Sequence, residues 1–189
     1  MDGFAKRKEK KKKQIFSASF ELVLKYGFEK VKVDEIALKA RVSPATIYNY
    51  FGTKEELYQQ MLNNWIDSLL KEYEEVLNSD NPFHEKIRDI MTREVENIGI
   101  LTNLSHEHPE SVQYFLHNIE NKFESFLIKV IQLGKREGYI STLYSEKVIK
   151  KYFKFFFHEI NDVIYTNNAN SNEEIEQLAQ LFFYGLLPR

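Results

Sequence analysis

The chain has 189 residues, of which 43% are hydrophobic, and its formal net charge is −2. A chain of this length can bury a full core, and the absence of cysteine excludes disulfides, thiol catalysis and cysteine-ligated zinc. Its apolar runs are too short for a bilayer span and no signal-peptide stretch follows the basic start, so we expect a cytoplasmic protein without membrane association.

The charge is unevenly distributed along the chain. Residues 1–54 contain 13 Lys and Arg against 6 Asp and Glu, giving +7, whereas residues 55–189 contain 13 against 22, giving −9. Such asymmetry indicates that one end faces a polyanion while the other end has a different role. The sequence therefore predicts two domains, residues 1–54 and residues 55–189.

Apolar residues recur at three- and four-residue spacing almost throughout, so the predicted fold class is all-α. A first helix ends near Tyr26, because Gly27 can adopt the left-handed conformation that stops a helix. The basic run from Lys6 to Lys13 is expected to be its frayed start. This run fits DNA proximity better than lipid binding or simple solvation, because the adjoining helix buries its apolar face in the small domain.

Two short helices follow, over residues 33–40 and from Pro44 to about Phe51. Ser43 is a good N-cap, and Pro44 suits the first helical position, where its missing N–H costs nothing. Gly52 supplies a second left-handed stop, and Thr53 to Glu56 forms a capping box that opens a fourth helix. Two short helices joined by three residues make a helix-turn-helix.

The second helix of such a motif lies in the major groove, while neighbouring helix starts bind phosphates. Asn can read adenine with two hydrogen bonds, and hydroxyl groups bond to phosphates or bases. Lys54 opens the next helix, where free N–H groups and the helix dipole favour an anion. We therefore expect DNA contacts from Thr46, Tyr48, Asn49, Tyr50 and Lys54, although either tyrosine also fits a packing role.

The order and spacing of several motifs resemble one known family. The matching segments are Ile15-Phe16-x-Ala18, Tyr26-Gly27-Phe28, Val33-Asp34-Glu35-Ile36-Ala37 and Val42-Ser43-Pro44-Ala45-Thr46-Ile47-Tyr48-Asn49-Tyr50-Phe51-Gly52-Thr53-Lys54-Glu55-Glu56-Leu57. Over about residues 8–62 they resemble the N-terminal DNA-binding domain of the TetR family of bacterial transcriptional regulators. The resemblance implies that residues 32–51 are the helix-turn-helix of an all-helical homodimer.

Two positions depart from the family pattern. Lys32 stands where Thr or Ser usually caps the second helix, and Arg41 stands where the turn usually has Gly. A left-handed Arg41 costs on the order of 1 kcal/mol relative to Gly. Our hypothesis is that both cations face the DNA backbone. The full set of expected DNA-binding residues is Lys32, Arg41, Ser43, Pro44, Ala45, Thr46, Tyr48, Asn49, Tyr50 and Lys54.

Beyond the motif the apolar pattern predicts longer helices, over about 54–78, 82–100, 109–117, 119–137, 145–166 and 172–186. The resemblance implies that the middle helices enclose an effector pocket, although each candidate also fits an ordinary core. Aromatic faces and the surplus of carboxylates favour an apolar or aromatic, cationic effector. The candidate lining residues are Trp65, Leu69, Ile90, Ile98, Leu101, Tyr114, Phe123, Leu127 and Phe153.

The last two predicted helices are apolar on too many sides for one core. The run Phe155-Phe156-Phe157 occupies about 300° of a helix circumference, so some of it must meet a second surface. An isologous helix bundle between two copies would cover it. We expect Phe156, Ile160, Leu178 and Phe182 to meet their counterparts across a two-fold axis.

No signature of catalysis or of a cofactor is present in the sequence. His106-Glu107-His108 lacks an evident third metal ligand, and no catalytic triad, paired carboxylates or Gly-rich phosphate loop has a readable spacing. The predicted function is a regulator, a repressor released by a small-molecule effector, that binds a palindromic operator as a homodimer. The alternatives are a chromosome-organising DNA-binding protein and an enzyme or carrier with a vestigial motif; the basic first 54 residues argue against the latter.

Overall fold

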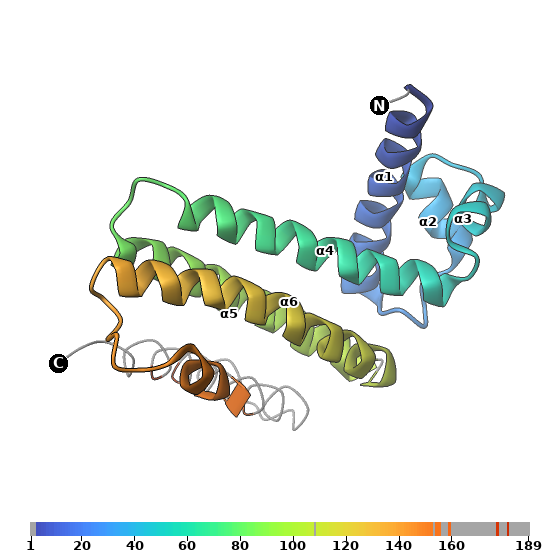
Figure 1. Ribbon diagram of the computed structural model, residues 1–189. Coiled ribbons are helices and arrows are strands. Elements are labelled where there is room, and N and C mark those ends of the chain that lie inside the picture. The colour runs from blue at the N-terminus through green and yellow to red at the C-terminus, as the bar shows by residue number, and fades with distance from the viewer. Residues whose placement is uncertain are drawn as a thin grey trace. The chain divides into compact units, whose positions relative to one another are not determined.

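The computed structural model describes residues 3–107, 109–152, 154, 155, 159, 177 and 181. Every regular element in these residues is a helix, which confirms the all-α prediction (Figure 1). Within them, no helix is both long and apolar enough to cross a bilayer. The elements are α1 (Gly3–Tyr26), α2 (Val33–Ala40), α3 (Pro44–Phe51), α4 (Lys54–Leu77), α5 (Phe83–Glu107) and α6 (Pro109–Arg136), and a further helical segment begins after Ser145.

The chain divides into two compact units. The first runs to Ser68 and includes residues 107–115, and the second comprises Leu69–His106 and the described residues from Leu116 onward. Helix α4 contributes residues to both units. The expected boundary between residues 54 and 55 coincides with the start of α4, whereas the first unit extends further along this helix.

The core of the first unit is built from one face of each of its helices. In α1 the apolar residues Ile15, Phe16 and Val23 recur at helical spacing and are buried. The rings of Phe16 and Phe51 lie 5.3 Å apart between centroids, which joins α1 to the end of α3. The buried partners on the other helices are Ile36, Ala37, Ile47, Leu57, Leu62 and Ile66.

The second unit has a separate core, in which α4, α5 and α6 contribute their apolar faces. The side chains of Ile140 and Phe83 approach Gly134 in α6 closely. A Cβ added to Gly134 would be 2.7 Å from Ile140 Cδ1 and 2.8 Å from Phe83 Cζ. Phe83 also stacks on Tyr139, with ring centroids 5.1 Å apart. The buried side chains of this core include Tyr73, Leu77, Ile87, Ile131 and Ile149.

Three sequence-based expectations about helices are wrong. Residues 109–136 form one helix, not two, because neither Gly nor Pro interrupts them before Gly134. Helix α5 continues past residue 100 to Glu107. A single glycine such as Gly99 lowers helix stability but does not end a helix when the residues around it favour helix. The basic run Lys6–Lys13 belongs to the regular helix α1 and is not frayed.

Several expected positions fall outside the described residues. They are the candidate pocket residue Phe153 and all four candidate dimer-interface residues, Phe156, Ile160, Leu178 and Phe182. The dimer interface therefore stays a prediction.

Candidate nucleic-acid interface

Helix α2 begins without the usual capping side chain. Lys32 occupies the N-cap position with extended backbone angles, and its side chain makes no capping hydrogen bond, as expected for lysine. The carboxylate of Glu35 accepts a hydrogen bond from the backbone N–H of Lys32 at 2.7 Å instead. This is the reverse half of a capping box. The Glu35 carboxylate thus partly replaces the missing Thr or Ser cap within the same turn. The Lys32 side chain is exposed.

The turn between α2 and α3 depends on a left-handed Arg41. Its φ is 53° and its ψ is 47°, and it is the one non-glycine residue with positive φ among the described residues. The N–H groups of Arg41 and Val42 donate to the carbonyls of Leu38 and Ala37, at 3.2 and 3.0 Å. This pair of bonds closes the end of α2 as a Schellman motif. Arg41 thus adopts the left-handed conformation that glycine adopts more easily, and its side chain is exposed.

Helix α3 starts as the sequence predicts. The Ser43 hydroxyl oxygen accepts a hydrogen bond from the Thr46 N–H at 3.2 Å, and Pro44 occupies the first turn. The hydroxyl groups of Ser43 and Thr46 are 2.9 Å apart and hydrogen-bonded. Ile47 and Phe51 are 1% and 3% exposed, so they fix the inward face of this short helix. The opposite face is therefore presented to solvent in a defined orientation.

The exposed face of α3 carries uncharged groups only. Ala45, Tyr48 and Asn49 are exposed, and Tyr48 retains 51% of its accessible surface. Tyr50 is half-buried and packs edge-on against Phe51, with ring centroids 6.1 Å apart. Of the two tyrosines, Tyr50 is thus the one with a packing role. No residue of Pro44–Phe51 is acidic or basic, so charge near this helix comes from its neighbours.

The Lys54 side chain does not face outward, as a residue that binds a phosphate would. The predicted capping box opens α4, with bonds from Thr53 N–H to Glu56 at 3.1 Å and from Glu56 N–H to Thr53 at 3.0 Å. The ammonium of Lys54, however, lies 4.2 Å from the centre of the Phe28 ring and donates to the Glu29 carbonyl at 3.4 Å. It must turn outward to reach a phosphate.

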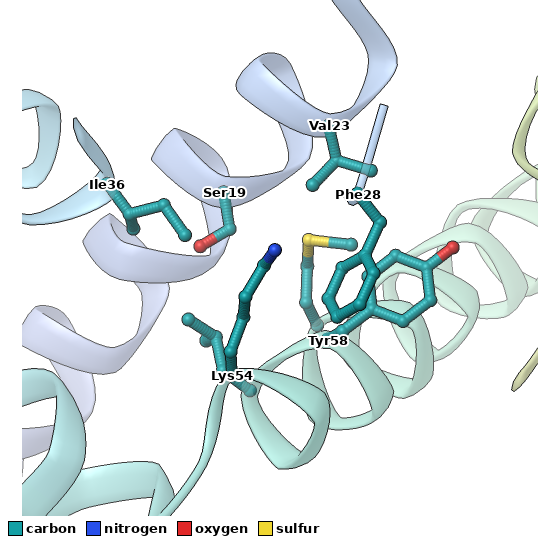
Figure 2. A pocket seen from close by; sticks show the side chains of 8 residues that line it. Ser19, Val23, Phe28, Ile36, Lys54 and Tyr58 are labelled. Atoms are coloured by element: carbon teal, nitrogen blue, oxygen red, sulfur yellow. The ribbon is translucent and has the colours of Figure 1, made fainter. Parts of the chain in front are cut away.

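Figure 2 shows Lys54 pointing towards a hollow between Ser19 and Phe28. The hollow has room for about one water molecule. It is therefore too small to hold an effector. Its lining residues are Ser19, Val23, Phe28, Ile36, Lys54, Leu57, Tyr58 and Met61.

The candidate effector-pocket residues are not all in one unit. Trp65 belongs to the first unit, where its ring lies 5.4 Å from that of Phe20 on α1. Leu69, Phe123 and Leu127 belong to the second unit and are buried, as is Ile90. Ile98, Leu101 and Tyr114 lie on α5 and α6, but their side chains are outside the described part of the structure.

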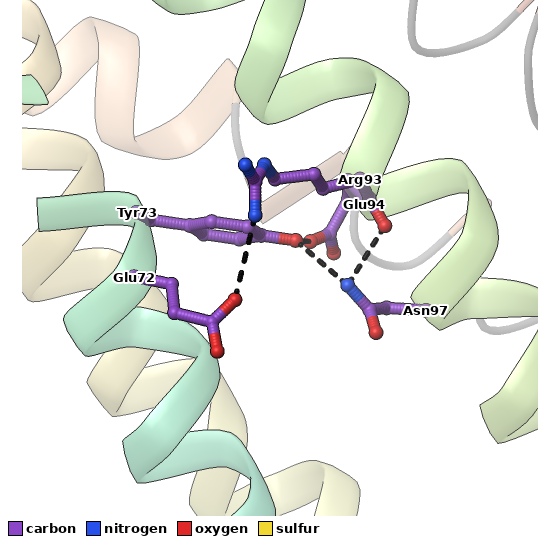
Figure 3. A network of polar contacts seen from close by, with 5 residues as sticks. All are labelled: Glu72, Tyr73, Arg93, Glu94 and Asn97. Atoms are coloured by element: carbon purple, nitrogen blue, oxygen red, sulfur yellow. Dashed lines mark hydrogen bonds and ion pairs between the residues drawn. The ribbon is translucent and has the colours of Figure 1, made fainter. Parts of the chain in front are cut away.

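A polar cluster inside the second unit had no signal in the sequence. The Tyr73 hydroxyl donates a 2.5 Å hydrogen bond to Glu94, and Asn97 donates to Tyr73 at 3.2 Å and to the Arg93 carbonyl at 2.7 Å (Figure 3). Arg93 faces Glu72 at 3.5 Å. These residues lie on α4 and α5 about twenty positions apart, so only the packing of the two helices brings them together.

Burial dominates the electrostatics of this cluster. It raises the pKa of the Glu94 carboxyl from 4.5 to about 7, although the hydrogen bond from Tyr73 opposes the shift. Burial, with the nearby Glu94 carboxylate, also raises the pKa of Tyr73 far above its usual range. Tyr73 therefore stays protonated and remains a hydrogen-bond donor, while Glu94 changes charge near neutral pH.

Three short-linked helices, of which α3 is capped and exposed with basic residues around it, form the arrangement of a helix-turn-helix DNA-binding protein. Residues 15–61 match the family described as bacterial regulatory proteins, tetR family. The HTH-type transcriptional regulator YhgD of Bacillus subtilis is 23% identical over 179 residues, covering 91% of this chain and 94% of that one. The regulator QacR of Staphylococcus aureus is 23% identical over 187 residues, covering 93% and 97%.

A solved structure of the transcriptional regulator FadR from Bacillus subtilis, in complex with stearoyl-CoA, has a similar fold. Its TM-score is 0.63 at 17% identity, over 91% of this chain and 97% of that one. Residues 15–61 thus match the DNA-binding domain of the tetR family, and the relatives that align over most of the chain are helix-turn-helix transcriptional regulators. Its named relatives are regulators of transcription, which favours this function over the chromosome-organising alternative.

Proposed function

We propose that this regulator binds a palindromic operator as a homodimer and represses transcription until a small-molecule effector releases it. The observation that carries the proposal is the exposed face of α3, held outward by buried Ile47 and Phe51 after the Ser43 cap. A helix fixed in this way can enter a major groove without first rearranging. Residues 1–54 would bind DNA, and residues 55–189 would bind the effector and dimerise in the cytoplasm.

Each expected DNA-binding residue has a distinct role in this proposal. Asn49 and Tyr48 read base edges, and the methyl groups of Ala45 and Thr46 contact thymine. Lys32 and Arg41 bind phosphates near the two ends of α2, where both are exposed cations. Supporting contacts come from Ser43, Pro44, Tyr50 and Lys54, the last after its ammonium leaves Phe28.

Operator selection tests the DNA-binding part of the proposal. Full-length protein is used to enrich a random duplex pool, and binding to the enriched sequence is measured against salt concentration. We expect a palindrome whose half-sites lie about 34–36 Å apart or a multiple of that distance. Asn49→Ala should relax sequence preference at one position per half-site, by roughly 1–3 kcal/mol. A wild-type protein that enriches no sequence would contradict the proposal.

Dimerisation is tested separately, by sedimentation of the full chain at micromolar concentration. The proposal requires a dimer, because one recognition helix per half-site needs two copies. A chain that sediments as a monomer both alone and on the operator would overturn this part.

The effector is proposed to be an apolar or aromatic molecule that carries a positive charge. Buried Leu69, Phe123 and Leu127 supply apolar surface in the second unit, and Glu94 supplies an ionisable carboxyl there. The FadR structure holds stearoyl-CoA, so acyl-CoA compounds belong in the same panel as lipophilic cations and aromatic acids. A true effector raises the melting temperature and releases the operator at the same concentration. Uniform failure of the panel would contradict this chemistry.

A further inference from the structure

The start of α1 forms a segment of high positive charge, which we call the basic arm and define as Lys6–Lys13. Seven of its eight residues are Lys or Arg, and Glu9 is the exception. The arm lies within the regular helix α1, and its side chains are exposed apart from a half-buried Lys12. It therefore presents its charge in fixed positions along a helix.

One face of the basic arm contacts the end of the recognition helix. The Lys8 ammonium lies 5.7 Å from the ring centre of Tyr50, and the Lys12 ammonium lies 5.9 Å from that of Phe51. These lysines are four residues apart and so share one helix face. One helical turn further on, Phe16 packs against Phe51. The arm is thus held beside the end of α3.

The other cations of the arm make no ion pair with any residue that the structure describes. This holds for Lys6, Arg7, Lys10, Lys11 and Lys13. Pairs such as Lys6 with Lys10 and Arg7 with Lys11 are spaced four apart, where like charges repel. An external polyanion would relieve this repulsion.

Duplex DNA fits this surface better than an anionic membrane. A helix that binds a membrane interface needs an apolar face to insert, and residues 6–13 contain no apolar residue. The arm is about 12 Å long at about 1.5 Å per residue, and duplex DNA carries one negative charge per about 1.7 Å of its axis. Several phosphates therefore come within reach of an arm held next to a helix in the major groove.

We propose that the basic arm binds phosphates of the DNA that flanks the base pairs read by α3. The inference rests on the proposed function and adds to it a second, sequence-independent contact surface. Binding through the arm would release counterions and would not depend on the identity of the flanking bases. Flanking DNA should then strengthen binding whatever its sequence.

The test compares two triple variants that remove the same charge. Lys10→Gln/Lys11→Gln/Lys13→Gln removes three cations from the arm, and glutamine keeps the helix because its helix propensity is similar to that of lysine. Lys71→Gln/Arg88→Gln/Arg136→Gln removes three exposed cations from the second unit and is the control. Affinity is measured against salt on the selected operator, both with flanking DNA and trimmed to the base pairs that determine specificity.

We expect the arm variant to have a shallower salt dependence, by about 0.9 in the log–log slope for each phosphate that the arm no longer neutralises. Its affinity for the flanked operator should fall about tenfold or more at about 0.1 M salt, whereas the control variant should match the wild type. Trimming the flanks should weaken the wild type but not the arm variant. A Lys10→Arg/Lys11→Arg/Lys13→Arg variant should restore wild-type binding.

An unchanged slope in the arm variant, with sequence-specific binding intact, would overturn this inference and leave the proposed function standing. A wild type that binds no duplex would instead overturn the proposed function and the inference with it. Arm-dependent binding to phosphatidylserine vesicles, with operator binding unaffected by the arm variant, would assign the arm to membranes and so contradict the inference.

Discussion

The Lys54 ammonium lies 4.2 Å from the centre of the Phe28 ring, whereas the sequence alone indicates a cation facing outward. The same ammonium donates to the Glu29 carbonyl at 3.4 Å. It therefore joins the first turn of α4 to the connection between α1 and α2. Binding a phosphate through Lys54 has to compete with these intramolecular contacts.

Replacing Lys54 distinguishes its stabilising contact with Phe28 from a contact with DNA phosphate. Lys54→Met keeps the apolar stem but removes the charge, so we expect the free energy of unfolding to fall by roughly 0.5–1 kcal/mol. Urea denaturation measures this loss, with Lys54→Arg as the charged control. Operator binding against salt then reports any phosphate contact. Unchanged stability together with a shallower salt dependence would show that the ammonium faces DNA and not Phe28.

Arg41 should combine backbone strain with a DNA contact. Arg41→Gly relieves the left-handed conformation and is expected to stabilise the fold by up to about 1 kcal/mol, reduced by the greater freedom of glycine in the unfolded chain. Arg41→Gln removes only the charge and should leave stability unchanged. Both variants should show an equally reduced salt dependence of operator binding. If neither alters it, Arg41 does not touch the backbone of the DNA.

A side chain at Gly52 is expected to cost stability, because the Glu56 carboxylate would have to leave its capping position. The φ of Gly52 is +80°, and an added Cβ would lie 2.2 Å from the Glu56 carboxylate oxygen that accepts the Thr53 N–H. Gly52→Ala should destabilise the protein by about 2 kcal/mol or more, since strain adds to the loss of the capping box. Gly138→Ala is the matched control, with φ +81° but open space around the added Cβ. Equal melting temperatures for the two variants would argue against the clash.

Glu94 should make stability depend on pH between about 4.5 and 7. Its pKa is raised to about 7 in the folded chain, so the folded state keeps a proton that the unfolded state has lost. The free energy of unfolding should therefore fall as pH rises through this window, by at most about 3 kcal/mol, and level off above it. Glu94→Gln should abolish this fall. The exposed Glu72→Gln serves as control, and identical pH profiles for wild type and Glu94→Gln would refute the assignment.

Local signals predict the helix-turn-helix well, because its boundaries depend on residues close together in the chain. The bounds of α2 and α3, the Ser43 cap and the stop at Gly27 follow from the preferences of single residues at helix ends. Glu35 lies three residues after Lys32, which is the spacing of a capping box. Lysine is not a preferred N-cap residue, however, so residue preferences do not predict a capping box here.

Features that depend on tertiary packing could not be predicted in the same way. The inward turn of Lys54 requires Phe28, which lies on a connection far away in sequence, and the Tyr73–Glu94 contact requires α4 and α5 to pack in one register. The prediction of a break within α6 was wrong for a different reason. Polar residues favour a boundary there, but neither Gly nor Pro is present to end the helix.

The lack of charge on α3 separates how tightly the protein holds DNA from how well it chooses a sequence. Counterions weaken contacts made by lysine and arginine, but they leave hydrogen bonds and methyl contacts at base edges largely unaffected. Raising the ionic strength should thus loosen the grip on operator and unrelated DNA alike, while the ratio between them persists. In a cell, changes in ion content would alter occupancy without redirecting the regulator to other genes.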